Sequence, residues 1–350
     1  MSLTRRIVVS TLAVVALALP MVALAPPANA TVMTPLTLEN GWTNAPFATR
    51  NAAVTNVGGI VTFEGAIATS GSNAVAFNLP AEFRPPADVY VTVDLCNANK
   101  GRLFIQTTGD VSVQAGTSFA DAQCFTSLEG VTFVLDSSAY RSLTLLNGWT
   151  GQPFSTRVAA VSKLNGVAYL AGAIATSGTN PVPFTIPMSY RPPTDVYVPV
   201  DLCNATTGRL HIASDGTVAI EARNGVFSNA QCFTSLEGVS YPLNATNFVA
   251  LSLVNGWTNA PFSTRDAMAD VRGGIVHFEG AVSTSGSNGV MFTLPANMRP
   301  PTDTYVHIDL CNSQDGRLYI THAGVVDVQA QNSFSDAQCF TSLEGASFAR

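Results

Sequence analysis

Residues 59–67 read Gly-Ile-Val-Thr-Phe-Glu-Gly-Ala-Ile, and their side chains alternate between apolar and polar types. This period of two is typical of a β-strand with one buried face, and the glycine pair Gly58-Gly59 is a hairpin signal. Similar short apolar segments follow at 75–79, 89–95 and 103–105. Turn-forming residues separate them, and no window of twelve residues has the pattern of an amphipathic helix. The segment therefore predicts an all-β protein.

The same pattern occurs three times along the chain. Asn-Gly-Trp triplets with their tryptophans at Trp42, Trp149 and Trp257 set a period of 107 and then 108 residues. A period of this length corresponds to a small domain rather than to a solenoid repeat. We expect three tandem antiparallel β-sandwich or jelly-roll modules joined by short linkers. Their predicted bounds are 36–135, 143–242 and 251–350.

Two cysteines in each copy indicate one disulfide per module. Six cysteines can pair in fifteen ways, but the repeat favours pairing within each copy. A zinc site is the weaker interpretation, because no second Cys or His stands nearby at ligand spacing. The second copy has one extra residue between its cysteines, which we place near Asn224 and Gly225 in a surface loop. The predicted pairs are Cys96 with Cys124, Cys203 with Cys232, and Cys311 with Cys339.

The first thirty residues have the features of a signal peptide. Arg5 and Arg6 precede an apolar stretch at 7–25, and Ala28-Asn29-Ala30 supplies a cleavage site. We therefore predict a secreted protein with signal peptide 1–30. The two arginines also resemble a twin-arginine signal, but that pathway exports proteins folded in the cytosol, where structural disulfides rarely form.

The composition excludes several partners. The formal charge is −6, and charged residues make up 11% of the chain, so we expect no nucleic-acid partner and no attraction to anionic membranes. No other segment reaches the eighteen continuous apolar residues of a membrane span, so we expect no membrane insertion. The apolar content is too high for a disordered chain.

One copy read from end to end resembles the β-sandwich head or tip modules of bacteriophage tail fibres and receptor-binding proteins. This resemblance implies a trimeric, non-catalytic module that recognises saccharides or other cell-surface ligands. The signal peptide and the cysteine pair depart from the phage pattern, so a host-encoded secreted protein is the better fit. Here three modules of one chain could pack as an intramolecular pseudo-trimer. The shared segments are 41–42, 46–50, 58–65, 79–86, 101–105, 109–111 and 128–133.

The sequence suggests two kinds of ligand-binding residue in each copy. A tryptophan face can stack on a sugar ring while the neighbouring asparagine bonds its hydroxyl groups, although a lone tryptophan in a small module is also a typical core residue. The arginines could hold an anion, or could pair with acids such as Asp94 or Glu129 and fix loops. The candidates are Asn40, Trp42, Arg50, Asn147, Trp149, Arg157, Asn255, Trp257 and Arg265.

The residues do not favour catalysis. The four histidines, His211, His277, His307 and His322, share no position across the copies, which excludes a common triad or histidine-ligated metal. A carboxylate pair such as Asp94 with Glu129 is the remaining enzymatic possibility, as in a glycosidase. We expect a non-catalytic, multivalent carbohydrate-binding protein without a cofactor. A purely structural extracellular or cell-wall protein and a glycan hydrolase are the alternatives.

Overall fold

The computed structural model describes residues 32–135 and 140–350. The predicted signal peptide and residues 136–139 of the first linker lie outside this range. The described strands pair in antiparallel fashion, which confirms the all-β class. Each module has its own apolar core, which contains Phe63 in the first, Tyr241 in the second and Phe278 in the third.

The first module is a sandwich of two layers. One layer has the strand order β1-β3-β4-β11, and the other combines β10-β5-β2 with β6-β9-β8-β7 through a bridge between Leu95 and Thr126. The bounds are β1 (Thr34–Pro35), β2 (Trp42–Asn44), β3 (Ala53–Val57), β4 (Ile60–Glu64), β5 (Ala66–Thr69), β6 (Val75–Asn78), β7 (Val89–Asp94), β8 (Lys100–Ile105), β9 (Asp110–Ala115), α1 (Phe119–Cys124), β10 (Thr126–Ser127) and β11 (Thr132–Val134).

The second module repeats this plan without a counterpart of β6. Pro181 and Pro183 occupy that segment, and proline has no amide hydrogen to donate to a ladder. An isolated bridge between Thr185 and Thr217 marks the position, together with hydrogen bonds from the Val218 and Ile220 amides to the carbonyls of Phe184 and Pro181. The bounds are β12 (Arg141–Ser142), β13 (Thr150–Gly151), β14 (Ala160–Leu164), β15 (Val167–Ala171), β16 (Ala173–Ala175), β17 (Val196–Asp201), β18 (Thr207–Ile212), β19 (Val218–Ala222), α2 (Phe227–Cys232), β20 (Thr234–Ser235) and β21 (Ser240–Pro242).

In the third module the second layer is one continuous sheet, β23-β26-β31-β28-β29-β30-β27. The two-residue strands β1, β12 and β22 directly precede the predicted module starts at 36, 143 and 251. The bounds are β22 (Val249–Ala250), β23 (Trp257–Asn259), β24 (Met268–Arg272), β25 (Ile275–Glu279), β26 (Ala281–Thr284), β27 (Val290–Thr293), β28 (Thr304–Leu310), β29 (Gln314–Ile320), β30 (Val325–Ala330), α3 (Phe334–Cys339), β31 (Thr341–Ser342) and β32 (Ser347–Ala349).

Each disulfide connects a short helix to the 3₁₀ turn that follows β7, β17 or β28. Cys96–Cys124, Cys203–Cys232 and Cys311–Cys339 are bonded, which confirms the predicted pairing. The helices α1, α2 and α3 have six residues each and end at the second cysteine of the pair. They are too short for a twelve-residue periodicity test, which is why the sequence did not predict them. Disulfides are typical of proteins that fold in an oxidising compartment.

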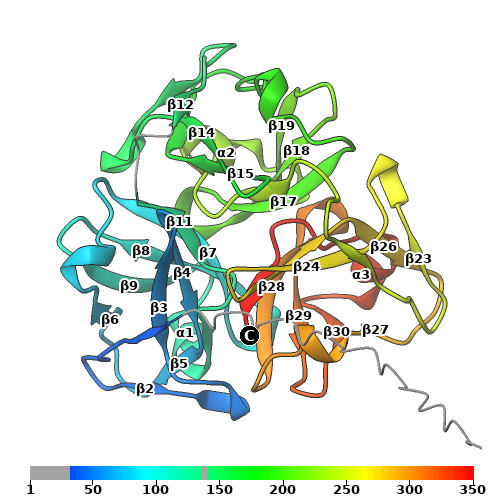
Figure 1. The fold of residues 1–350 in the computed structure, drawn as a ribbon. Helices are drawn as coiled ribbons and strands as arrows, with labels where there is room; N and C mark the ends of the chain where they lie inside the picture. Colours follow the sequence, from blue (N-terminus) through cyan, green and yellow to red (C-terminus); the bar gives the residue numbers. More distant parts are fainter. Residues whose placement is uncertain (1–31, 136–139) are drawn as a thin grey trace, which may run out of the picture.

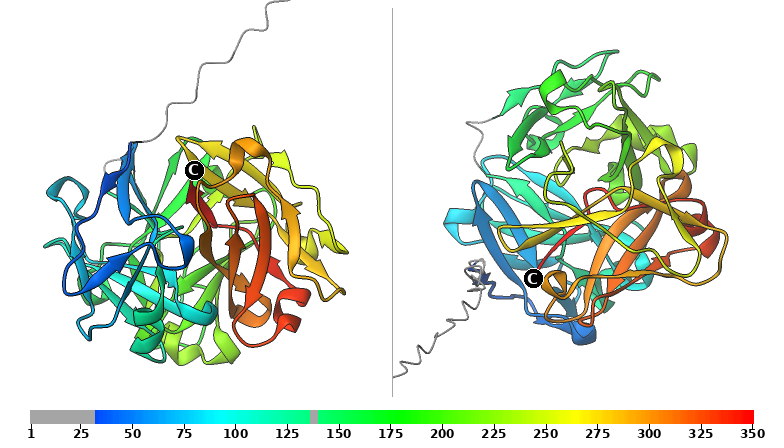
Figure 2. Two further views of the ribbon diagram at one scale, coloured as in Figure 1. Left: turned by 90° about the horizontal axis from the view of Figure 1, so that it is seen from below. Right: turned by 45° about the vertical axis from the view of Figure 1, so that its right-hand side comes forward.

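The three modules surround a common centre, where β7, β17 and β28 contact one another (Figure 1). Contacts between modules repeat in a cycle. A serine hydroxyl of each module donates to a tyrosine carbonyl of the preceding one: Ser235 to Tyr90 (2.6 Å), Ser342 to Tyr197 (2.6 Å) and Ser127 to Tyr305 (2.5 Å). The chain is therefore a pseudo-trimer with a pseudo-threefold axis, and Figure 2 shows its three lobes from two further directions.

Among the described residues, no helix is long and apolar enough to cross a membrane.

Candidate functional site

The three candidate tryptophans lie inside their modules. Trp42 and Trp257 are 5% exposed and Trp149 is 4% exposed. Each indole N–H donates to a backbone carbonyl, as from Trp42 Nε1 to Asn73 at 2.9 Å. Beyond that, each ring packs edge to face against a phenylalanine of the short helix, as Trp42 does against Phe119 at 6.3 Å. We therefore revise the sequence-based choice: these rings are core residues and offer no open face to a sugar.

The candidate asparagines and arginines form hydrogen bonds and ion pairs with other residues of the protein. The side-chain amide of Asn40 donates to the carbonyl of Val75 at 3.0 Å. Arg50 pairs with Glu64, and its Nε lies 3.2 Å from Glu129. The same roles belong to Asn147 and Asn255, to Arg157 with Glu237, and to Arg265 with Glu279. An anion would have to displace these contacts, so the structure favours the loop-fixing interpretation.

The conserved spacing of Asp94, Asp201 and Asp309 serves the module interfaces. Each aspartate binds an arginine of a neighbouring module: Asp94 with Arg317 (3.2 Å), Asp201 with Arg102 (2.9 Å) and Asp309 with Arg209 (2.9 Å). Sequence reasoning missed these arginines, because both partners lie in strands and are far apart along the chain. Their cyclic pairing fixes each module against the next.

An aromatic cleft lies beside one of these ion pairs, between the second and third modules. It has a volume of about 100 Å³ and is lined by Tyr197, Arg209, Phe262, Cys311, Asn312 and Phe340. Phe262 meets Phe340 edge to face at 5.6 Å, and Phe340 meets Tyr197 in the same way at 5.1 Å. The Arg209 guanidinium lies 4.8 Å from the centre of the Tyr197 ring. The cleft therefore combines aromatic faces with a cation.

The same groups recur at the other two interfaces. Phe154 meets Phe233 at 5.6 Å, and Phe47 meets Phe125 at 5.7 Å. Phe233 in turn contacts Tyr90, and Phe125 contacts Tyr305, each at 5.1 Å. The guanidinium groups of Arg102 and Arg317 lie 4.9 and 4.8 Å from the Tyr90 and Tyr305 rings. We call these three sets of side chains the interface clefts, after the cavity that is found at the set around Tyr197.

The outer phenylalanine of each cleft is both exposed and strained. Phe47, Phe154 and Phe262 are 60%, 59% and 56% exposed. Their φ angles are +55°, +55° and +54°, in the left-handed region that a bulky side chain rarely adopts. Such strain costs about 1–3 kcal/mol and gathers at functional sites. The sequence signal was a phenylalanine that follows proline in a polar turn in all three copies.

The clefts differ at one ring, which stacks on the tyrosine. Phe104 stacks on Tyr90 at 4.6 Å, whereas His211 stacks on Tyr197 at 4.4 Å. In the third copy Tyr319 takes this place, 4.9 Å from Tyr305. The three clefts therefore share a frame and differ in the ring that stacks on the tyrosine, which is not among the residues lining the cleft at Tyr197.

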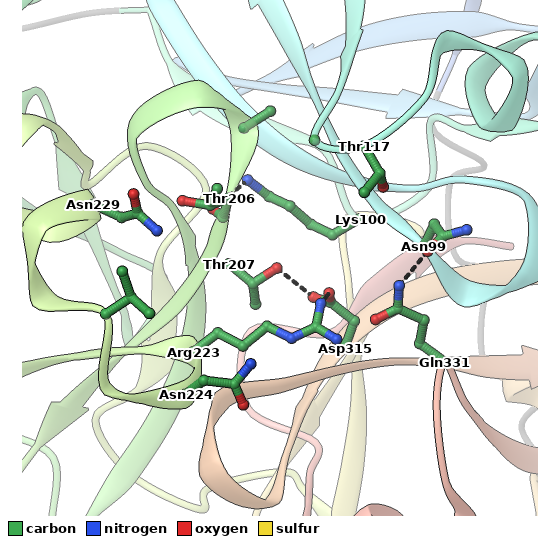
Figure 3. Close-up of a pocket in the computed structure, with 13 residues that line it drawn as sticks. Asn99, Lys100, Thr117, Thr206, Thr207, Arg223, Asn224, Asn229, Asp315 and Gln331 are labelled. Atoms are coloured by element: carbon green, nitrogen blue, oxygen red, sulfur yellow. Dashed lines mark hydrogen bonds and ion pairs between the residues drawn. The ribbon is translucent and has the colours of Figure 1, made fainter.

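A separate polar cavity of about 190 Å³ lies where all three modules meet (Figure 3). Lys100 and Thr117 come from the first module, Arg223 and Asn229 from the second, and Asp315 from the third. Lys100 pairs with Asp201, and Arg223 Nη1 lies 2.7 Å from Asp315. Burial lowers the pKa of Lys100, and nearby Asp201 opposes this shift.

The carboxyl pair considered for a glycosidase is buried in separate ion pairs. Burial raises the pKa of Asp94 to about 7, against the attraction of Arg317. Burial also raises the pKa of Glu129 to about 7, against the attraction of Arg50. Within residues 32–135 and 140–350, no three His, Cys, Asp or Glu side chains are grouped as metal ligands.

Comparisons with known protein families, curated proteins and solved structures find no match for this chain.

Proposed function

We propose that this chain is a secreted, multivalent protein that binds cell-surface or extracellular carbohydrate through its three interface clefts. The observation that carries the proposal is the exposed, left-handed phenylalanine at the rim of every cleft. The edge-to-face contact with the inner phenylalanine contributes about 0.5–1.5 kcal/mol, which at best balances a strain of about 1–3 kcal/mol, so a role in recognition explains why the residue occurs three times.

The chemistry of the clefts suits a sugar. The flat face of Phe262 can cover the apolar C–H face of a sugar ring, as aromatic side chains commonly do in shallow ligand sites. The exposed amide of Asn312 stands beside it as a hydrogen-bond donor, and the Arg209 guanidinium, which is paired with Asp309 and Glu221, also lines the cleft. An open cleft of about 100 Å³ can take one face or edge of a single sugar ring, while the rest of the glycan stays outside.

The arrangement of the clefts supports multivalency. Each lies between two modules, so their relative positions are fixed by the same ion pairs and hydrogen bonds that hold the pseudo-trimer. A surface that presents many copies of one glycan then engages several clefts at once, and avidity can exceed single-site affinity by about 10²–10⁴. The resemblance to phage receptor-binding modules agrees with this proposal.

A glycan array tests it. The mature chain should be retained on a defined subset of glycans, and a variant carrying Phe47→Asn, Phe154→Asn and Phe262→Asn should lose retention. Asparagine tolerates a positive φ, so the variant should fold with a melting temperature close to that of the parent. Met188→Asn is the matched control, because Met188 is 81% exposed and lies outside the clefts. Retention of the triple variant at the parental level, or no retention of the parent on any glycan, contradicts the proposal.

A further inference from the structure

The polar cavity of Figure 3 differs from the interface clefts in its lining, which is mostly polar and comes from all three modules. At this end of the axis, the residue after the ninth strand of the first module is Gly116. Its counterparts are Arg223 and Gln331. Arg223 reaches Gln314 and Asp315 of the third module, and Gln331 reaches Asn99 of the first. Gly116 has no side chain to cross to the second module, so this junction lacks the polar bridge that Arg223 and Gln331 make at the other two. The space of the cavity lies beside the close contact of Gly116 with Ala205.

The space cannot be filled by a small change at Gly116. A Cβ there would lie 2.7 Å from the carbonyl oxygen of Ala205 across the junction. The extra residue of the second copy, predicted near Asn224, lies at this cavity in the 3₁₀ turn Arg223–Gly225. The inserted residue therefore forms part of the cavity wall and does not merely lengthen a surface loop.

At three positions around the cavity, the residue present carries a more positive charge than at least one of its counterparts in the other two copies. Asn229 lines it, whereas the equivalent residues in the other copies are the acids Asp121 and Asp336. Arg223 stands where the other copies have Gly116 and Gln331. Each of these two changes removes a negative charge or adds a positive one.

Lys100 occupies the third position, where its counterparts are Thr207 and Asp315. Among the charged residues that line the cavity, Lys100 and Arg223 are cationic and Asp315 is anionic, which leaves one positive charge in the lining. Asp201 lies behind the lining and pairs with Lys100 and Arg102.

The hydrogen-bonding groups at the cavity indicate the kind of ligand. The Lys100 ammonium donates to Asp201 and to the carbonyl of Thr206, and a lysine has a third N–H to give. The Oε1 atom of Gln331 is a buried acceptor without a hydrogen-bond partner among the described residues. A buried polar atom of this kind is normally satisfied by a partner. A ligand that meets both needs carries an anionic acceptor and a hydroxyl donor.

We propose that this cavity binds one small hydroxylated carboxylate, such as a hydroxy acid or a sugar acid. Its carboxylate lies between Lys100 and Arg223, and a hydroxyl group donates to Gln331 Oε1. The volume of about 190 Å³ is somewhat larger than the cavity of about 150 Å³ that accommodates benzene in an engineered protein, so a ligand the size of a single sugar ring fits. This site is independent of the interface clefts and of the proposed function.

Calorimetric titration of the mature chain with glycerate and glucuronate tests the proposal, with glycerol and glucose as neutral analogues. One of the two carboxylates should bind saturably with one site per chain, and its neutral analogue should not. Asn229→Asp and Arg223→Gln restore the residues of the other copies and should fold. Each should weaken binding about tenfold or more, the usual effect of losing a charge-assisted hydrogen bond or adding a like charge.

Asp121→Asn is the matched control, since it makes the reverse exchange in the first copy, away from the cavity. It should leave affinity unchanged, as should the triple phenylalanine variant of the clefts. The proposal is overturned if neither carboxylate binds, if the neutral analogues bind as tightly, or if both cavity variants bind as the parent does.

Discussion

Replacing Gly238 by alanine should weaken the interface between the second and first modules. Gly238 has a φ of +81°, and a Cβ on it would lie 2.8 Å from Cγ1 of Val91 in β7. The substitution therefore carries two penalties. The left-handed conformation costs an L-residue about 1–2 kcal/mol, and overpacking a tight contact costs about 1–3 kcal/mol more. The expected total loss in the free energy of unfolding is about 2–5 kcal/mol.

Gly225 supplies the matched control in the same module. Its φ is +70°, but a Cβ there would meet nothing within 4 Å, so Gly225→Ala should lose only about 1–2 kcal/mol. Urea unfolding followed by tryptophan fluorescence measures both, because the three indoles are buried. Adding Val91→Ala should recover part of the loss of Gly238→Ala, since it removes the clashing methyl group. Equal losses at Gly238 and Gly225 would refute the assigned contact between modules.

Three further predictions concern buried charges and the disulfides. Burial raises the pKa of Asp94 to about 7, so ionisation of this carboxyl group lowers the stability of the folded state as the pH rises. The free energy of unfolding of Asp94→Asn, measured by urea titration, should therefore increase relative to that of the parent by about 2 kcal/mol between pH 5 and pH 8. If the difference in unfolding free energy between the variant and the parent shrinks or stays constant as the pH rises, the predicted direction is wrong. Asp201→Asn leaves Lys100 buried without its counter-ion and should lower the unfolding free energy by about 3–5 kcal/mol, with a loss below 1 kcal/mol counting against the pair. Replacing both Cys96 and Cys124 by serine opens a 28-residue loop and should cost about 3.6 kcal/mol, seen as a lower urea midpoint, while an unchanged midpoint would argue against the loop-closure account.

Local chemistry explains why much of the fold could be predicted. The alternation at 59–67 predicted β4 and β5, because a half-buried strand needs a period of two. The disulfides followed from the repeat, since each copy must close its own loop. The short helix α1 escaped prediction because six residues cannot display a helical period.

For the candidate site, the sequence predicted residue types that can bind a ligand, but not where their side chains lie. The sequence drew attention to Trp42 and Arg50, which are distinctive residue types at fixed spacing. Their burial and pairing with groups such as Glu129 depend on how the layers of the module close. Phe47 looked like an ordinary turn residue, and its partners Phe125 and Tyr305 belong to two different modules.

By itself, the sequence determined the triplication, the all-β class and the disulfide pairing, because periodicity and loop closure act between residues of one copy. Only the tertiary structure decided which side chains meet across modules: the Asp–Arg pairs, the interface clefts and the polar cavity around Lys100. These contacts join residues about one or two repeats apart, and a period says nothing about which copy a side chain faces. The departures at Gly116, Arg223 and Asn229 acquire meaning only when the pseudo-threefold axis brings them to one junction.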